Sequence, residues 1–174
     1  MSAPVRRRAG LAVAGCGAIL LAALSAAPHR PRLLWNTTRS APLGLYRVAA
    51  AAPVKAGDWV VARPPPALAG WFARRGYLPS GVPLVKRVAA VAGDRVCRRG
   101  DLVTVDGRPA ARALERDHRG RVLPVWRGCV ALQVGEVFLL NAAADSLDGR
   151  YFGVSRASDV VGRATPLWTW ESAP

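Results

Sequence analysis

A run of twenty uncharged residues near the start of the chain constrains the fold more than any other sequence feature. It extends from Ala9 to Pro28 and follows three arginines at positions 6–8. About twenty apolar or small residues are long enough to cross a bilayer as one α-helix, and arginines before such a helix keep the N-terminus in the cytoplasm. We therefore expect residues 1–8 to be cytoplasmic, residues 9–28 to form a membrane anchor, and residues 29–174 to lie on the far side of the membrane.

The same run also fits a cleavable signal peptide. The small residues Ala23, Ser25 and Ala27 stand where a cleavage site is expected. Under both interpretations, the rest of the chain is exported from the cytoplasm. That part has about 145 residues, which is long enough for one domain with its own core.

After Pro28 the pattern predicts a mainly β protein with antiparallel sheets. Short apolar segments alternate with turns that contain glycine, and such spacing is typical of an all-β domain. The predicted strands are residues 58–62, 84–91, 101–106 and 137–140, and one short helix is predicted over residues 67–75. The more polar, arginine-rich region from about Cys97 to Cys129 predicts a smaller subdomain inserted into the β core.

The chain carries a formal net charge of +14, almost entirely from arginine. A nucleic-acid partner is not expected, because the arginines are scattered and no helix-turn-helix, zinc-finger or RNA-recognition pattern is present. The only two lysines are Lys55 and Lys86. Because an arginine side chain cannot release its proton in a protein, a lysine retained in such a chain is a candidate for a role that arginine cannot fill.

The cysteines predict a disulfide and no metal site. Cys16 lies in the apolar run, whereas Cys97 and Cys129 flank the predicted subdomain. No Cys-x-x-Cys or Cys/His spacing suggests zinc. We expect Cys97 and Cys129 to pair if this region meets an oxidising compartment.

Three further stretches carry residues capable of acyl-transfer chemistry. In the first, Ser40 precedes a Pro-x-Gly turn, which exposes both its hydroxyl and its backbone N–H. In the second, Lys86 lies within an apolar predicted strand, where desolvation lowers the pKa of an ammonium and favours a general base. In the third, Ser146 and Asp148 share one face if that segment is extended, and Asp148 and Arg150 are placed to form an ion pair. Each stretch alone also fits an ordinary loop, half-exposed strand or polar turn.

Taken in order, the three stretches resemble the successive motifs of the signal-peptidase superfamily, most closely the TraF-type conjugative-transfer peptidases. The family's Ser-x-Pro-x-Gly-Leu-Tyr motif is matched by residues 40–46. Its Lys-Arg-Val segment ending in Gly-Asp is matched by residues 86–94, and its late Ser-x-Asp-Ser-Arg-Tyr-Phe/Trp-Gly motif is similar to residues 146–153. The resemblance extends from the apolar run to about Arg163.

Two departures distinguish this chain within the superfamily. Gly149 stands where the family has a second serine, which predicts a looser backbone there. The Gly-Asp-Asn-Arg run of general signal peptidases is replaced by Asn141 and three alanines, and their Ser-Met-x-Pro form is also absent. Both differences favour the TraF-like branch.

The resemblance implies coiled antiparallel sheets of the signal-peptidase/LexA-like type and a Ser-Lys dyad. Ser40 is expected to be the nucleophile and Lys86 the general base. An oxyanion hole is expected from the Ser40 N–H and the Thr38 hydroxyl, with Ser146 orienting Lys86 and the pair formed by Asp148 and Arg150 in support. No metal or organic cofactor is implied. His29 and His118, which have no triad pattern, are expected to be solvated.

The resemblance also implies a location and a substrate. The peptidase domain is expected on the periplasmic side of a bacterial inner membrane. Only twelve residues separate Pro28 from Ser40, so Ser40 lies within about 40 Å of the bilayer. The expected substrate is an exported precursor, such as a pilin precursor of a conjugation system. The alternatives are a general signal peptidase, a LexA-like self-cleaving protein and a non-catalytic, membrane-tethered β module.

Overall fold

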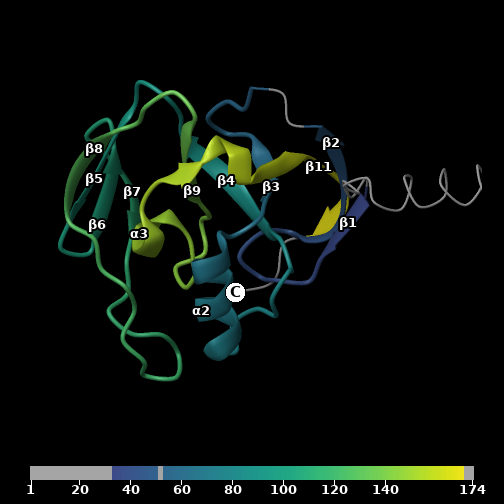
Figure 1. Cartoon of the computed structure of the whole chain (residues 1–174), viewed down its shortest axis with the longest axis horizontal. Helices are drawn as coiled ribbons and strands as arrows, with labels where there is room; N and C mark the ends of the chain where they lie inside the picture. Colours follow the sequence, from purple (N-terminus) through teal and green to yellow (C-terminus); the bar gives the residue numbers. More distant parts are fainter. Residues whose placement is uncertain (1–32, 51–52, 171–174) are drawn as a thin grey trace, which may run out of the picture.

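The structure, a computed structural model, describes residues 33–50 and 53–170, and its strands form two antiparallel β-sheets (Figure 1). The larger sheet has seven strands in the order β1-β2-β11-β3-β4-β9-β10. Their bounds are β1 (Leu33–Asn36), β2 (Leu43–Ala50), β3 (Trp59–Ala62), β4 (Leu84–Ala90), β9 (Glu136–Leu140), β10 (Ser155–Arg156) and β11 (Val160–Trp170).

The smaller sheet has four strands in the order β7-β6-β5-β8 and lies at the opposite end of the molecule from β1 (Figure 1). Its strands are β5 (Arg95–Arg99), β6 (Leu102–Val105), β7 (Arg108–Arg112) and β8 (Gly128–Ala131). The helices are short, and they are α2 (Pro66–Arg74), α3 (Gly149–Phe152) and the 3-10 turn η1 (Ala157–Asp159). The prediction of a mainly β, antiparallel fold is confirmed.

The membrane anchor predicted at residues 9–28 lies outside the described residues. Within residues 33–50 and 53–170, no helix is long and apolar enough to cross a bilayer. The predicted helix over residues 67–75 is observed one residue earlier, as α2. It begins at Pro66, a position where proline's missing N–H costs no helical hydrogen bond.

A tight turn at Asp106-Gly107 joins β6 to β7. Asp106 and Gly107 both have positive φ values, 48° and 77°. Positive φ at both central residues is the requirement of a tight hairpin turn, and Asp-Gly is a preferred pair for it. Here the local sequence alone determines the backbone.

A shared core holds the two sheets together. Phe138 and Leu140 of β9 pack in one buried cluster with Val96 and Val103 of the smaller sheet. The central strand β4 is hydrogen-bonded to β3 on one side and to β9 on the other. A side chain on the inner face of β4 is therefore removed from water by strands on both sides.

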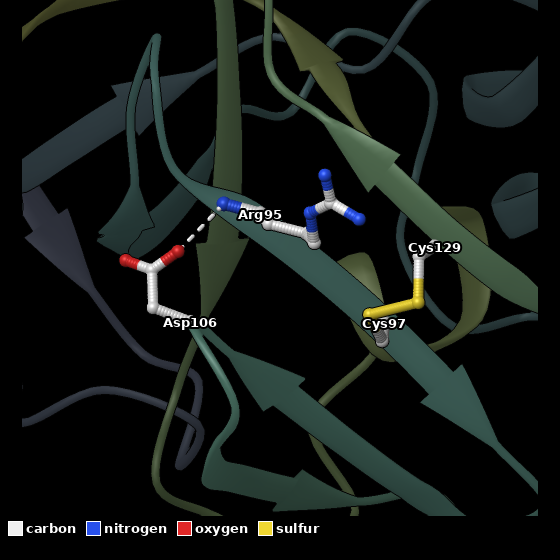
Figure 2. Close-up of a disulfide and its surroundings, with 4 residues drawn as sticks. All are labelled: Arg95, Cys97, Asp106 and Cys129. Carbon is white, nitrogen blue, oxygen red and sulfur yellow. Dashed lines mark hydrogen bonds between the residues drawn. A yellow bond between two sulfur atoms is a disulfide. The ribbon is translucent and has the colours of Figure 1, made fainter.

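Cys97 and Cys129 lie directly opposite each other on β5 and β8 and form a disulfide (Figure 2). β8 is an edge strand whose residues are all exposed. Little apolar burial holds that edge, so the covalent bond is its main attachment besides the backbone ladder. On the other side of β5, the Arg95 N–H donates to Asp106 Oδ1 at 2.8 Å, which ties the start of the strand to the hairpin turn.

Candidate active site

Ser40 lies in the turn that joins β1 to β2, and the side chain of Asn36 organises this turn. Asn36 is buried at the end of β1. Its Nδ2 donates to the carbonyl oxygens of Thr38, Ala41 and Pro42 at 3.0, 3.2 and 3.0 Å. One amide group therefore fixes the backbone on both sides of Ser40.

Thr38 is held by the same side chain. Its backbone N–H and its hydroxyl both donate to Asn36 Oδ1, at 3.1 and 2.8 Å. The Thr38 hydroxyl has one proton, and in this arrangement that proton points to Asn36. Thr38 can donate to an oxyanion only after its hydroxyl rotates away, and such a rotation is open to a threonine hydroxyl.

Lys86 is the third residue of β4 and is only 3% exposed. Its Nζ donates to the hydroxyl oxygen of Ser146 at 2.8 Å. Burial lowers the pKa of Lys86 from 10.5 to about 8, while the nearby carboxylates of Asp148 and Asp145 oppose the shift and Arg150 adds to it. A lysine with this pKa is partly neutral at mildly alkaline pH, as a general base requires.

Asp148 and Arg150 form a buried ion pair behind Lys86. Arg150 Nε donates to Asp148 Oδ1 at 2.8 Å, and Nη2 donates to Oδ2 at 3.0 Å. Asp148 also caps α3 by accepting the Arg150 N–H, and it accepts the N–H of Asn141. Because both charges are paired and further hydrogen-bonded, the pair fixes the loop that carries Ser146.

One cavity of about 240 Å³ brings together Thr38, Ser40, Lys86 and Ser146. Asp148 and Arg150 do not line this cavity, and Cys97 and Cys129 lie away from it in the smaller sheet. The cavity therefore unites a candidate nucleophile, a buried lysine and the serine that contacts it. This geometry suits acyl transfer by a serine hydroxyl, with a lysine as the proton acceptor.

Comparison with known proteins places this chain in a family. The family model described as "Signal peptidase, peptidase S26" matches residues 6–170. The chain belongs to the signal peptidase family.

Relatives of known name also match most of the chain. The chain is 37% identical to a plasmid transfer protein TraF from Escherichia coli, over 95% of this chain and 97% of that protein. It is 38% identical to a conjugal transfer protein TraF from Agrobacterium fabrum, over 78% of this chain and 82% of that protein. Among solved structures, a signal peptidase I from Enterococcus faecalis is matched with a TM-score of 0.39 and 17% identity, over 67% of this chain and 100% of that one.

The signal peptidase family is a family of serine peptidases. In this member, segments far apart in the sequence form the wall of the cavity. Tyr77, which follows α2, donates its hydroxyl to the carboxylate of Asp117. Arg121 pairs with the same carboxylate at 2.7 Å and lies over the Tyr77 ring. Forty residues separate Tyr77 from Asp117, and nothing in the local sequence indicates this contact.

His118 is exposed, as predicted, and it also lines the cavity with Ser40 and Lys86. Its position follows from Asp117, which the contacts with Tyr77 and Arg121 hold against the end of α2. His29 lies outside the described residues.

The prediction of a looser backbone at Gly149 is wrong. Gly149 is buried, and a Cβ atom there would lie 2.8 Å from the Leu139 carbonyl oxygen and 2.8 Å from the Phe138 ring. The glycine allows the loop to pack directly on β9. Sequence reasoning missed this packing, because the contact arises between segments ten residues apart.

Sequence reasoning also missed Asn36 and Asn141. Asn36 stands two residues before Thr38, a spacing at which an asparagine side chain commonly bonds the backbone. That local signal was sufficient to suggest a turn. Asn141 gave no such signal, because its side-chain partners lie in β4.

Proposed function

We propose that this signal peptidase family member is a membrane-anchored serine endopeptidase that uses Ser40 and Lys86 as a catalytic dyad. The observation that carries the proposal is the buried Lys86, bonded to Ser146 at 2.8 Å, in the cavity that Ser40 also lines. A lysine on an ordinary half-exposed strand extends its ammonium into water. The side chain of Lys86 is buried instead. Its lowered pKa lets the neutral amine accept a proton at mildly alkaline pH.

The reaction follows from these positions. Ser40 Oγ attacks the scissile carbonyl, and neutral Lys86 accepts the hydroxyl proton. Lys86 then passes that proton to the leaving amine, and the C–N bond breaks to leave an acyl-enzyme. A water molecule attacks the ester, Lys86 accepts its proton, and the proton returns to Ser40 as the acid product leaves.

The oxyanion of each tetrahedral intermediate needs hydrogen-bond donors. The Ser40 N–H and the Thr38 hydroxyl are the proposed donors, and the hydroxyl becomes available when it rotates away from Asn36 Oδ1. Loss of one such donor typically costs about 3–4 kcal/mol of transition-state stabilisation.

The proposed substrate is an exported precursor protein, and specifically a pilin precursor of a conjugation system. Two observations support this choice. The relatives that match nearly the whole chain carry the names of plasmid and conjugal transfer proteins. The apolar run at residues 9–28 is also long enough for a membrane anchor, which would hold the enzyme next to a membrane-bound substrate.

Exposed tryptophans support a position at the membrane surface. Trp35 of β1 contacts Trp168 and Trp170 of β11, with ring centroids 6.1 and 5.8 Å apart, and all three are at least 44% exposed. Tryptophan is enriched at membrane–water interfaces. Trp35 stands a few residues after the apolar run, and Trp168 and Trp170 of the last strand pack beside it.

Paired lysine variants test the proposed dyad. Cleavage of a co-expressed pilin precursor should be lost in Ser40→Ala and in Lys86→Arg, because a guanidinium cannot release its proton near neutral pH. The matched control is Lys55→Arg, which changes the other lysine, an exposed one, in the same way. His118→Ala should retain cleavage, since no histidine takes part. A folded Lys86→Arg protein with full cleavage activity would rule out Lys86 as the general base, whereas a wild-type protein that cleaves no precursor would favour a tethered binding module.

The proposed orientation has its own test. A reporter that is active only in the periplasm, fused after Arg163, should be active, whereas a cytoplasm-only reporter at the same point should be silent. The opposite pattern would contradict the export of the domain. A mature protein shortened by about 25 residues would instead identify residues 9–28 as a cleaved signal peptide.

A further inference from the structure

Asn141 lies directly after β9, at the point where the backbone ladder between β4 and β9 ends. The last regular pairs of that ladder are Val88 with Leu139 and Arg87 with Leu140. One more residue in the same register would place Asn141 opposite Lys86. The ladder does not continue there through the backbone of Asn141.

The side chain of Asn141 makes the missing bonds instead. Its Oδ1 accepts from the Arg87 N–H at 3.0 Å, and its Nδ2 donates to the Val85 carbonyl at 3.1 Å. These are the two backbone groups on either side of Lys86 that point toward β9. A primary amide has both an acceptor and a donor, so Asn141 replaces a peptide group of the neighbouring strand.

The backbone of Asn141 is bound by the ion pair behind the site. Its N–H donates to Asp148 Oδ2 at 3.0 Å, and its carbonyl oxygen accepts from Arg150 Nη2. Asn141 is itself buried. It therefore connects Asp148 and Arg150 to the main chain of Lys86.

Lys86 is thus held at two points by a single loop. Asn141 binds the backbone on both sides of it, and Ser146, five residues later in the same loop, binds its Nζ at 2.8 Å. The distance between the base and Ser146 therefore depends on how firmly Asn141 fixes β4 to this loop. A shift of β4 would also admit water to the lysine.

We propose that Asn141 is a positioning residue of this peptidase, whose side-chain amide fixes the main chain of Lys86 against the loop that carries Ser146. The proposal rests on the proposed function of Lys86 as the general base. Both amide atoms are needed. An aspartate at this position would face the Val85 carbonyl with an oxygen in place of a donor, and a glutamine would place the amide one methylene too far.

Lysine NMR tests the proposal without any substrate. The chain has only two lysines, so full-length protein labelled with [13Cε]lysine gives one signal for Lys86 and one for the exposed Lys55, which serves as the internal reference. In the wild-type protein the Lys86 signal should titrate with a midpoint of about 8. In Asn141→Ala and Asn141→Asp the midpoint should rise by at least about one pH unit, because water or a carboxylate then stabilises the ammonium.

The matched control is Ala142→Gln, which adds an amide at the next, exposed position and should leave the midpoint unchanged. In peptidase assays, Asn141→Ala should lower kcat at least about tenfold with little change in KM, and the pH profile should move with the NMR midpoint. Should Asn141→Ala not fold, Asn141→Gln provides the same measurement, since it keeps a buried amide and changes only its reach.

The outcomes separate the two proposals. Variants that fold, keep the wild-type Lys86 midpoint and keep the wild-type kcat overturn the positioning role of Asn141. A shifted midpoint in a protein that cleaves no precursor retains the positioning role and rejects the proposed peptidase function.

Discussion

Lys86 Nζ and Ser146 Oγ lie 2.8 Å apart in the interior of the protein, although sixty residues separate them in the chain. The contact brings together the end of the central strand β4 that faces the cavity and the loop that precedes α3. A buried ammonium without a partner is costly, so this hydrogen bond offsets part of the desolvation of Lys86. It also aims the nitrogen, which is what a general base requires.

Removal of the Ser146 hydroxyl should affect the rate more than the fold. Ser146→Ala removes one orienting hydrogen bond, so we expect kcat to fall about tenfold, with a change in unfolding free energy of about 1 kcal/mol or less. Precursor cleavage and urea unfolding measure the two quantities. An unchanged rate would remove Ser146 from the site.

Removal of the Asp148 carboxylate should affect the fold more than the chemistry. Asp148→Ala leaves the buried charge of Arg150 unpaired and removes the cap of α3. Breaking one side of a buried ion pair typically costs about 3–5 kcal/mol. Urea unfolding should show a loss of this order, and the exposed pair of Arg112 and Asp101 provides the control, since Asp101→Ala should change stability far less. A stable Asp148→Ala protein without activity would reverse the assignment of roles.

The buried lysine should make stability depend on pH in a defined direction. The pKa of Lys86 falls from 10.5 to about 8 on folding, so between these values the unfolded chain binds more protons than the native protein. Stability should therefore rise with pH across this window, and below about pH 8 the charged lysine destabilises the fold by on the order of 3 kcal/mol.

The comparison with Lys86→Met isolates this effect, because the other titrating groups are shared. Methionine has a similar length and no charge, so the variant should gain stability over wild type at pH 7, and the gain should shrink toward pH 10.5. Urea unfolding of both proteins at several pH values measures the difference. A difference that stays constant over this range would show that Lys86 is not desolvated.

Gly149 should resist replacement by the serine that the family motif contains at this place. A Cβ atom at position 149 would meet the Leu139 carbonyl and the Phe138 ring, both at 2.8 Å, and such overpacking typically costs about 1–3 kcal/mol. Thermal unfolding of Gly149→Ser should show this loss. Gly70→Ser is the control, because its Cβ meets only the flexible end of Arg74. If Gly149→Ser equalled the wild type in stability, the packing on β9 would be looser than described.

The bond between Cys97 and Cys129 should stabilise the smaller sheet. Its sequence separation is 32 residues, for which the chain-entropy model gives about 3–4 kcal/mol. Thiol labelling of denatured, unreduced protein should leave both cysteines unmodified, and the reduced protein should unfold at lower urea. If both cysteines were labelled in protein purified from the membrane, the disulfide would be absent, as it would be in a reducing compartment.

The sequence by itself determined the features that depend on near neighbours. The Asp106-Gly107 turn, the start of α2 at Pro66 and the alternation of short apolar strands all follow from local backbone preferences. Ser40 and Lys86 were identified from the sequence because a hydroxyl before a Pro-x-Gly turn and a lysine in an apolar strand are visible in short motifs, and the order of those motifs resembles a known family.

Only the tertiary structure decided which groups surround these residues. The amide of Asn141 bonds to β4, more than fifty residues earlier, and Tyr77 meets Asp117 from a different element. Gly149 is a further example. Its local sequence predicted a loose backbone, whereas in the structure it packs tightly against Phe138. Such contacts depend on strand register and on side-chain volume in a shared core, and neither is encoded within a single short segment.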